Sequence, residues 1–118
     1  MNLAEIRKLI DTSNFVEALS QIDRLVTQVS ECPYLWNLRG DLIQLLDTKD
    51  GPPLGEAAES YANALKLNPN DLEALEGLAH FYDAVDRKPI EARKYAKAYL
   101  EKSKKAVIAM EQILAENA

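Results

Sequence analysis

The sequence predicts an all-α protein, an α-solenoid of three stacked antiparallel helix pairs with an extended C-terminal capping helix. The first observation is composition: 47% of the 118 residues are apolar, with only four glycines and five prolines. Alanine, leucine, glutamate and lysine dominate, and these residues favour helices. No segment alternates apolar and polar residues over the length of a half-buried strand. These features favour helices throughout.

The second observation is an apolar pattern that repeats with helical spacing. One set of small and apolar positions recurs three times: Ala18, Ile22, Leu25; Ala57, Tyr61, Ala64; Ala92, Ala96, Tyr99. A second set falls between its copies: Asn2, Ile6, Leu9; Trp36, Gly40, Ile43; Leu75, Ala79, Tyr82. The repeating unit is therefore a helix pair. One pair cannot bury both of its apolar faces, so neighbouring pairs must stack.

The breaks between periodic segments set the expected helix bounds, which are 3–11, 14–30, 33–47, 54–67, 70–85 and 89–116. Two capping boxes are expected, at Asn14 with Glu17 and at Asn70 with Glu73. We expect a single domain, 1–118, with repeats at 1–32, 33–70 and 71–104 and a C-terminal helix extension at 105–118.

The extension has an apolar stripe formed by Val107, Met110, Ile113 and Leu114. Because stacked repeats leave one apolar end uncovered, the stripe is expected to cap that end. Self-association and docking of a partner are the alternatives.

These positions resemble the tetratricopeptide repeat family. The middle repeat has the clearest match, through Trp36, Gly40, Ala57, Tyr61, Ala64, Leu65 and the proline junction at 67–70. The resemblance covers nearly the whole chain. The sequence departs from the family pattern in a longer turn at 47–53, in Asn2 where a bulky residue is expected, and in Ala96 where an aromatic is usual.

The resemblance implies that the first helix of each pair lines a groove that binds a peptide or helix of another protein. The groove residues it implies are Tyr34, Asn37, Leu38, Asp41, Gln44, Leu45, Glu73, Glu76, Gly77, His80 and Asp83, with Arg7 and Asp11 from the first repeat. Asp41, Glu73, Glu76 and Asp83 are carboxylates without a matching set of cations. The clamp with which some family members hold a C-terminal carboxylate is therefore absent, and a basic or amphipathic partner segment is expected.

The net charge of −5 disfavours a nucleic-acid partner, because phosphate contacts need a basic surface. The charge is uneven: residues 1–86 have six Lys/Arg and fifteen Asp/Glu (−9), whereas residues 87–118 have eight and four (+4). The N-terminus has no unbroken apolar run, and no segment is apolar enough to cross a membrane. With Cys32 as the single cysteine, we expect a cytoplasmic protein with no membrane partner.

No nucleophile–base pair or phosphate-binding loop emerges, so neither enzymatic activity nor a cofactor is expected. Glu76, His80 and Asp83 have a spacing that places them on one helix face. A zinc site would need further histidine or cysteine ligands, so no metal is expected there.

Two functional classes remain. The first is a protein-binding module or adaptor that uses the acidic groove, with a monomer favoured over a homodimer formed through the C-terminal helix. The second is a structural assembly unit that associates with itself through its terminal helices. Light scattering on a size-exclusion column distinguishes the two.

Overall fold

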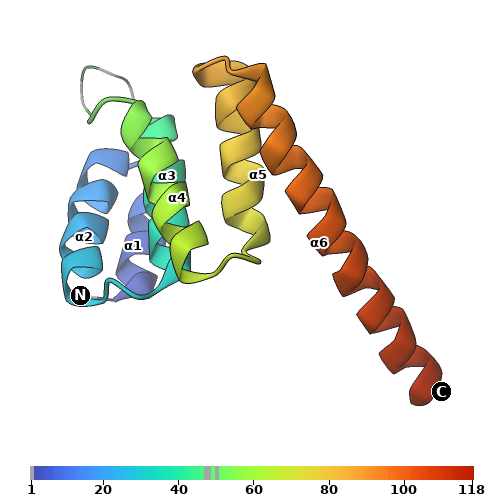
Figure 1. The fold of residues 1–118 in the computed structure, drawn as a ribbon. Helices are drawn as coiled ribbons and strands as arrows, with labels where there is room; N and C mark the ends of the chain where they lie inside the picture. The colour runs from blue at the N-terminus through green and yellow to red at the C-terminus, as the bar shows by residue number, and fades with distance from the viewer. Residues whose placement is uncertain (1, 47–48, 50) are drawn as a thin grey trace.

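The computed structural model describes residues 2–46, 49 and 51–118, and within these ranges every regular element is a helix (Figure 1). The helices are α1 (Leu3–Asp11), α2 (Phe15–Gln28), α3 (Pro33–Leu45), α4 (Gly55–Leu67), α5 (Leu72–His80), the π-helical turn η1 (Phe81–Val85) and α6 (Pro89–Glu116). The all-α prediction is confirmed. The long turn expected at 47–53 lies partly outside the described residues.

The helix starts differ in detail from the sequence prediction. Prolines do open α3 and α6, where the missing N–H group has no helical acceptor in any case. The expected capping boxes are wrong. The Asn14 side chain makes no cap hydrogen bond, and α5 is capped by Asp71, whose carboxylate accepts from the Ala74 amide at 3.1 Å. Asn70 lies one residue too early for that role.

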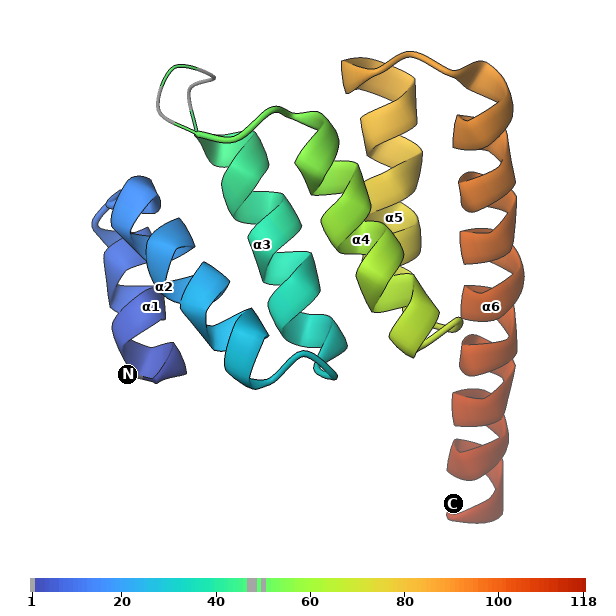
Figure 2. The same ribbon diagram turned by 60° about the vertical axis from the view of Figure 1, so that its left-hand side comes forward.

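Consecutive helices pack side by side in chain order, as the turned view in Figure 2 shows. The most extensive contact is between α3 and α4, and α6 packs on α5. Helix α3 also contacts α5 directly, although α4 separates them in sequence. The first helices of the second and third pairs are therefore neighbours in space.

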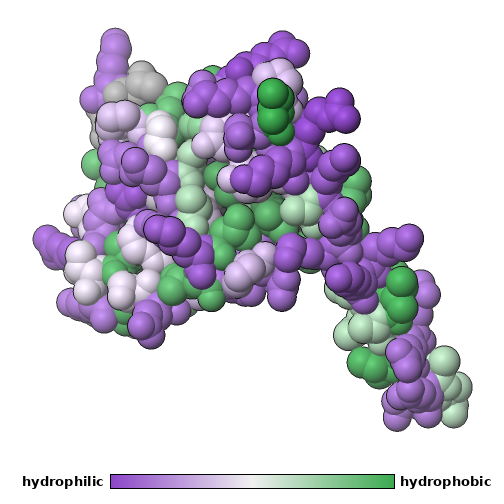
Figure 3. Space-filling view, viewed as in Figure 1, coloured by the Kyte–Doolittle hydropathy of each residue, from purple (hydrophilic) through white to green (hydrophobic). Residues whose placement is uncertain are grey.

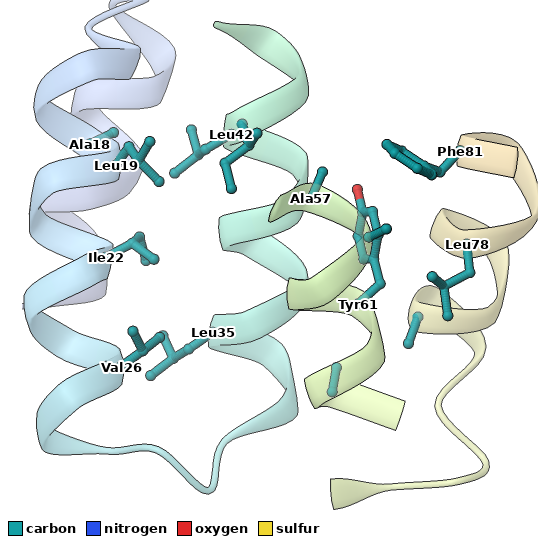
Figure 4. Close-up of a cluster of buried hydrophobic side chains, with 14 of the residues drawn as sticks. Ala18, Leu19, Ile22, Val26, Leu35, Leu42, Ala57, Tyr61, Leu78 and Phe81 are labelled. Carbon is teal, nitrogen blue, oxygen red and sulfur yellow. The ribbon is translucent and has the colours of Figure 1, made fainter. Parts of the chain in front are cut away.

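The core is continuous from α1 to the end of α5, and Figure 4 shows its central part. Ile22, Leu42, Tyr61 and Leu78 are at most 2% exposed. Trp36 lies at the edge of this core, only partly buried, and its indole N–H donates to the Ser30 carbonyl at 2.8 Å. The buried aromatic residues of the core are Tyr61 and Phe81, each 2% exposed.

A polar network joins three helices on another side of α3. The guanidinium of Arg39 donates to Asp23 of α2 at 2.7 Å, and to Ser60 and Glu56 of α4 at 2.8 and 3.1 Å. The Arg39 side chain is 14% exposed. One cation thus connects α2, α3 and α4, a contact that periodicity does not reveal.

The end of α6 departs from the expected capping role. No residue of α6 is buried, and its last turns project away from the other helices (Figure 1). Val107, Met110, Ile113 and Leu114 are 50–74% exposed, and apolar surface is visible on the projecting end in Figure 3. Because no glycine or proline interrupts the helix here, it continues straight and does not fold back. The radius of gyration, 16.1 Å, accordingly exceeds the roughly 13.5 Å of a globular domain of this length.

Candidate functional site

A pocket of about 430 Å³ lies on the surface formed by α3 and α5, and we call it the α3–α5 pocket. Its lining residues are Tyr34, Asn37, Leu38, Asp41, Gln44, Tyr61, Glu73, Glu76, Gly77 and His80. All the groove residues expected from α3 and α5 are among them except Leu45 and Asp83. Arg7 and Asp11 of α1 do not line the pocket.

Tyr61 of α4 reaches this pocket because two glycines make room for its ring. A Cβ atom added at Gly40 of α3 or at Gly77 of α5 would lie 2.7 Å from the Tyr61 ring. The same three ring atoms are nearest in both cases, so the two backbones meet around one edge of the ring. Tyr61 was not among the expected site residues because it belongs to the second helix of its pair.

The Tyr61 hydroxyl joins two polar side chains of α3. It donates to the Asp41 carboxylate at 2.5 Å and accepts from the Gln44 amide at 2.7 Å. Burial raises the pKa of Asp41 above its ordinary value; the Tyr61 hydrogen bond opposes this shift, and the charge of Glu76 adds to it. Burial, with the neighbouring Asp41 carboxylate, also raises the pKa of Tyr61, so the phenol remains a donor.

Asn37 has a buried oxygen without a hydrogen-bond partner. Asn37 is only 2% exposed, and its side-chain amide nitrogen donates to the Asp71 carboxylate at 3.1 Å. Asp71 is itself fixed as the cap of α5. Because a carboxylate accepts and does not donate, this contact sets which end of the amide faces Asp71. The other end, Oδ1, has no hydrogen-bond partner in the described part of the chain.

The remaining polar contacts lie around the mouth of the pocket. The Tyr34 hydroxyl accepts from the Arg7 guanidinium at 2.7 Å, which connects α1 to α3. His80 Nε2 lies 3.9 Å from a Glu76 oxygen. Among the residues that the structure describes, no lysine or arginine lines the pocket, so its walls offer three carboxylates and no permanently charged cation.

Asp83 lies outside the α3–α5 pocket because α5 does not continue as an α-helix beyond His80. The π-helical turn at Phe81–Val85 widens the helix and changes the angular spacing of its side chains. Asp83 instead lines a smaller pocket of about 300 Å³ with Ala92 and Arg93 of α6. Leu45 occupies the last turn of α3 and is 54% exposed.

A second, more apolar pocket continues this surface toward α6. It has a volume of about 300 Å³ and shares Glu76 and His80 with the α3–α5 pocket. The other lining residues are Ala79, Ala96, Tyr99 and Leu100. The acidic pocket and an apolar strip therefore lie side by side.

Glu76, His80 and Asp83 do not form a metal site, and no other cluster of three or more His, Cys, Asp or Glu side chains in the described ranges could hold a metal ion. None of the helices described is both long and apolar enough to span a membrane.

Comparisons with models of protein families, with curated proteins and with solved structures found no match to this chain.

Proposed function

We propose that this chain is a protein-binding module, a short α-solenoid of tetratricopeptide type whose acidic α3–α5 pocket holds a basic, amphipathic segment of another protein. The observation that supports it best is the gathering of Asp41, Glu73 and Glu76 in one pocket without a lysine or arginine. The neighbouring strip at Ala79, Ala96 and Leu100 would bury the apolar side of the segment. The proposal involves no catalytic step and no cofactor.

Charge and apolar contact have separate roles in this proposal. The carboxylates attract a cationic segment and orient it, an effect that salt weakens. Burial on the strip supplies affinity that salt does not weaken.

A designed sixteen-residue helix of lysine and leucine, free of arginine, tests the proposal. Its affinity is measured at low and high salt for the wild type and for Asp41→Asn/Glu73→Gln/Glu76→Gln, which neutralises the three carboxylates of the pocket. Exposed ion pairs contribute roughly 0–1 kcal/mol each, so the triple variant should lose about tenfold in affinity at low salt. Its salt dependence should also fall.

The matched control is Glu17→Gln/Glu31→Gln/Glu59→Gln, which makes the same change of charge at exposed residues outside the pocket. Its affinity should stay within about twofold of the wild type, because distant exposed charges are screened. Equal losses in the two triple variants would mean that only the net charge matters, and the proposal would then fail.

A second candidate function, self-association, is favoured by the exposed stripe on α6. Leu100, Val107 and Leu114 recur every seven residues, with Met110 between the last two. All four are more than half exposed. We propose that the occupant in this case is α6 of a second copy, running antiparallel.

The charges beside the stripe are the reason for that orientation. Lys104 and Glu111 lie seven residues apart on the same flank. In an antiparallel pair centred between them, each Lys104 would face Glu111 of the other copy. A contact confined to one stretch of helix is small, so the dimer should form only at high protein concentration.

Light scattering over a range of concentrations, with Lys104→Glu, Glu111→Lys and their combination, tests this candidate. Each single exchange should weaken the dimer and the double exchange should restore it. A monomer at every concentration, or single exchanges without effect, would exclude pairing through α6.

A further inference from the structure

The walls of the α3–α5 pocket contain more hydrogen-bond acceptors than donors. Three carboxylates line it, from Asp41, Glu73 and Glu76. Two side chains that line it already use a donor within the protein: the Tyr61 hydroxyl donates to Asp41, and Gln44 donates to Tyr61. A ligand that brings several donors would therefore match this pocket.

Asn37 supplies an independent observation that points the same way. It lines the pocket, it is 2% exposed, and its Oδ1 has no partner. The Asn37 amide nitrogen donates a hydrogen bond to Asp71. A 180° flip of the side-chain amide is therefore unfavourable, because the amide oxygen would then face a carboxylate. A buried acceptor without a donor is unfavourable, so a bound donor at this point would recover that cost.

We infer that the α3–α5 pocket is a socket for one arginine side chain of the partner, with Asn37 Oδ1 and the Asp41 carboxylate as its acceptors. This inference rests on the proposed function and names the partner residue that the site recognises. An arginine fits better than a lysine because its planar guanidinium has five donors in fixed directions. These can reach an amide oxygen and a carboxylate at the same time.

The socket is held in shape before any ligand binds. The hydrogen bond from the Tyr61 hydroxyl orients the Asp41 carboxylate. The close backbones at Gly40 and Gly77 fix the position of the Tyr61 ring. Asp71, the cap of α5, orients Asn37. The two acceptors are therefore oriented before binding, which favours a rigid, planar cation. Asn37 Oδ1 is covered in the free protein, so the atoms over it must shift for the guanidinium to reach it.

The test uses three capped pentapeptides, Gly-Ser-Xaa-Ser-Gly, in which Xaa is arginine, lysine or citrulline. Binding is followed by two-dimensional NMR at the Asn37 side-chain amide and at the backbone amides of Gly40 and Gly77. The arginine peptide should give saturable shifts at these signals and bind about tenfold more tightly than the lysine peptide. The citrulline peptide, which keeps the shape but loses the charge, should give no saturable shift.

Asp41→Asn is the informative variant, because an asparagine oxygen still accepts from Tyr61 and the fold is kept. It should weaken the arginine peptide at least about tenfold, the value of one charge-assisted contact. Asp83→Asn is the matched control, because it makes the same chemical change at a residue outside the α3–α5 pocket. It should alter the affinity by less than about twofold.

The lysine–leucine helix separates failure of the inference from failure of the proposed function. If that helix shifts the pocket signals while the arginine pentapeptide does not, the socket is wrong and the acidic groove remains. Equal affinities for the arginine and lysine peptides also overturn the socket. If neither the helix nor the pentapeptide shifts the pocket signals, both the inference and the proposed function fail.

Discussion

Gly77 and Tyr61 are so close that a methyl group on residue 77 would lie 2.7 Å from the tyrosine ring. The ring belongs to a residue only 2% exposed, and Asp41 and Gln44 hold its hydroxyl, so it can move little. The same holds for Gly40 on the facing helix. In both helices the absence of a side chain is what allows α3 and α5 to approach each other.

We therefore expect Gly77→Ala to destabilise the fold by a net of up to about 2 kcal/mol, because overpacking costs about 1–3 kcal/mol and improved helix propensity offsets about 1 kcal/mol of this. Gly55→Ala is the control, since a Cβ atom there meets nothing within 4 Å. Urea denaturation should show a loss for the first variant and no loss for the second. A Gly77→Ala variant that is as stable as the Gly55→Ala variant would contradict the close contact.

Asp41 should lower the stability of the folded chain at neutral pH. Its pKa is raised in the fold above the ordinary 3.8, chiefly by burial, so the folded protein binds the proton more tightly than the unfolded chain does. Stability from this group is therefore present below pH 3.8 and is lost as the pH rises through the higher folded value.

Asp41→Asn should accordingly be as stable as the wild type or more stable at pH 7, and the difference should disappear below about pH 4. Partial exposure of the side chain keeps the gain below about 1 kcal/mol. Paired urea titrations across this pH range measure it. A variant clearly less stable than the wild type at pH 7 would show that the charge stabilises the fold.

Arg39 should be the most important cation for stability, because three side chains on two other helices accept from it. Arg39→Met keeps the bulk and removes the donors, and should cost about 1–3 kcal/mol. Lys88→Met is the comparison, because its partner Asp86 and the lysine are both more than half exposed. That variant should cost less than about 1 kcal/mol in thermal or urea unfolding.

Removing residues 104–118 should leave the rest of the fold intact. The contacts that hold α6 lie earlier in the helix: Tyr95 stacks on Tyr82 with ring centroids 6.1 Å apart, and Lys102 donates to Asn70 at 2.7 Å. We expect a loss of less than about 1 kcal/mol, as for other exposed positions. Truncation after Lys94 removes both contacts and should be clearly destabilising; similar melting temperatures for the two truncations would contradict this assignment.

Periodicity predicted the helices well because it depends on local spacing and burial. The expected bounds of α1 match the structure, and α3 and α6 begin at the expected residues, Pro33 and Pro89. Periodicity does not register which polar side chains meet across helices. The Arg39 network and the place of Tyr61 in the pocket were therefore missed, although the glycines at 40 and 77 were a signal that a large ring lies nearby.

The misplacement of Asp83 has a different origin. Counting i, i+4 and i+7 assumes that the helix keeps its pitch, and α5 changes pitch immediately after His80. The capping residue of α5 was missed for a related reason: in a run of Asn68, Asn70 and Asp71, each of the three has a side-chain oxygen that could cap.

The π-helical turn at Phe81–Val85 also means that the direction of α6 depends on how many residues precede it. A π turn spans one residue more between hydrogen-bond partners than an α turn does, so it is equivalent to an insertion into α5. Deleting Ala84 would let the helix return to α geometry and would rotate everything after it by about 100°. Tyr95 would then point away from Tyr82, and α6 would leave α5 although every contact residue was still present. In this part of the molecule, the number of residues in the π-helical turn determines the direction in which α6 leaves the pocket.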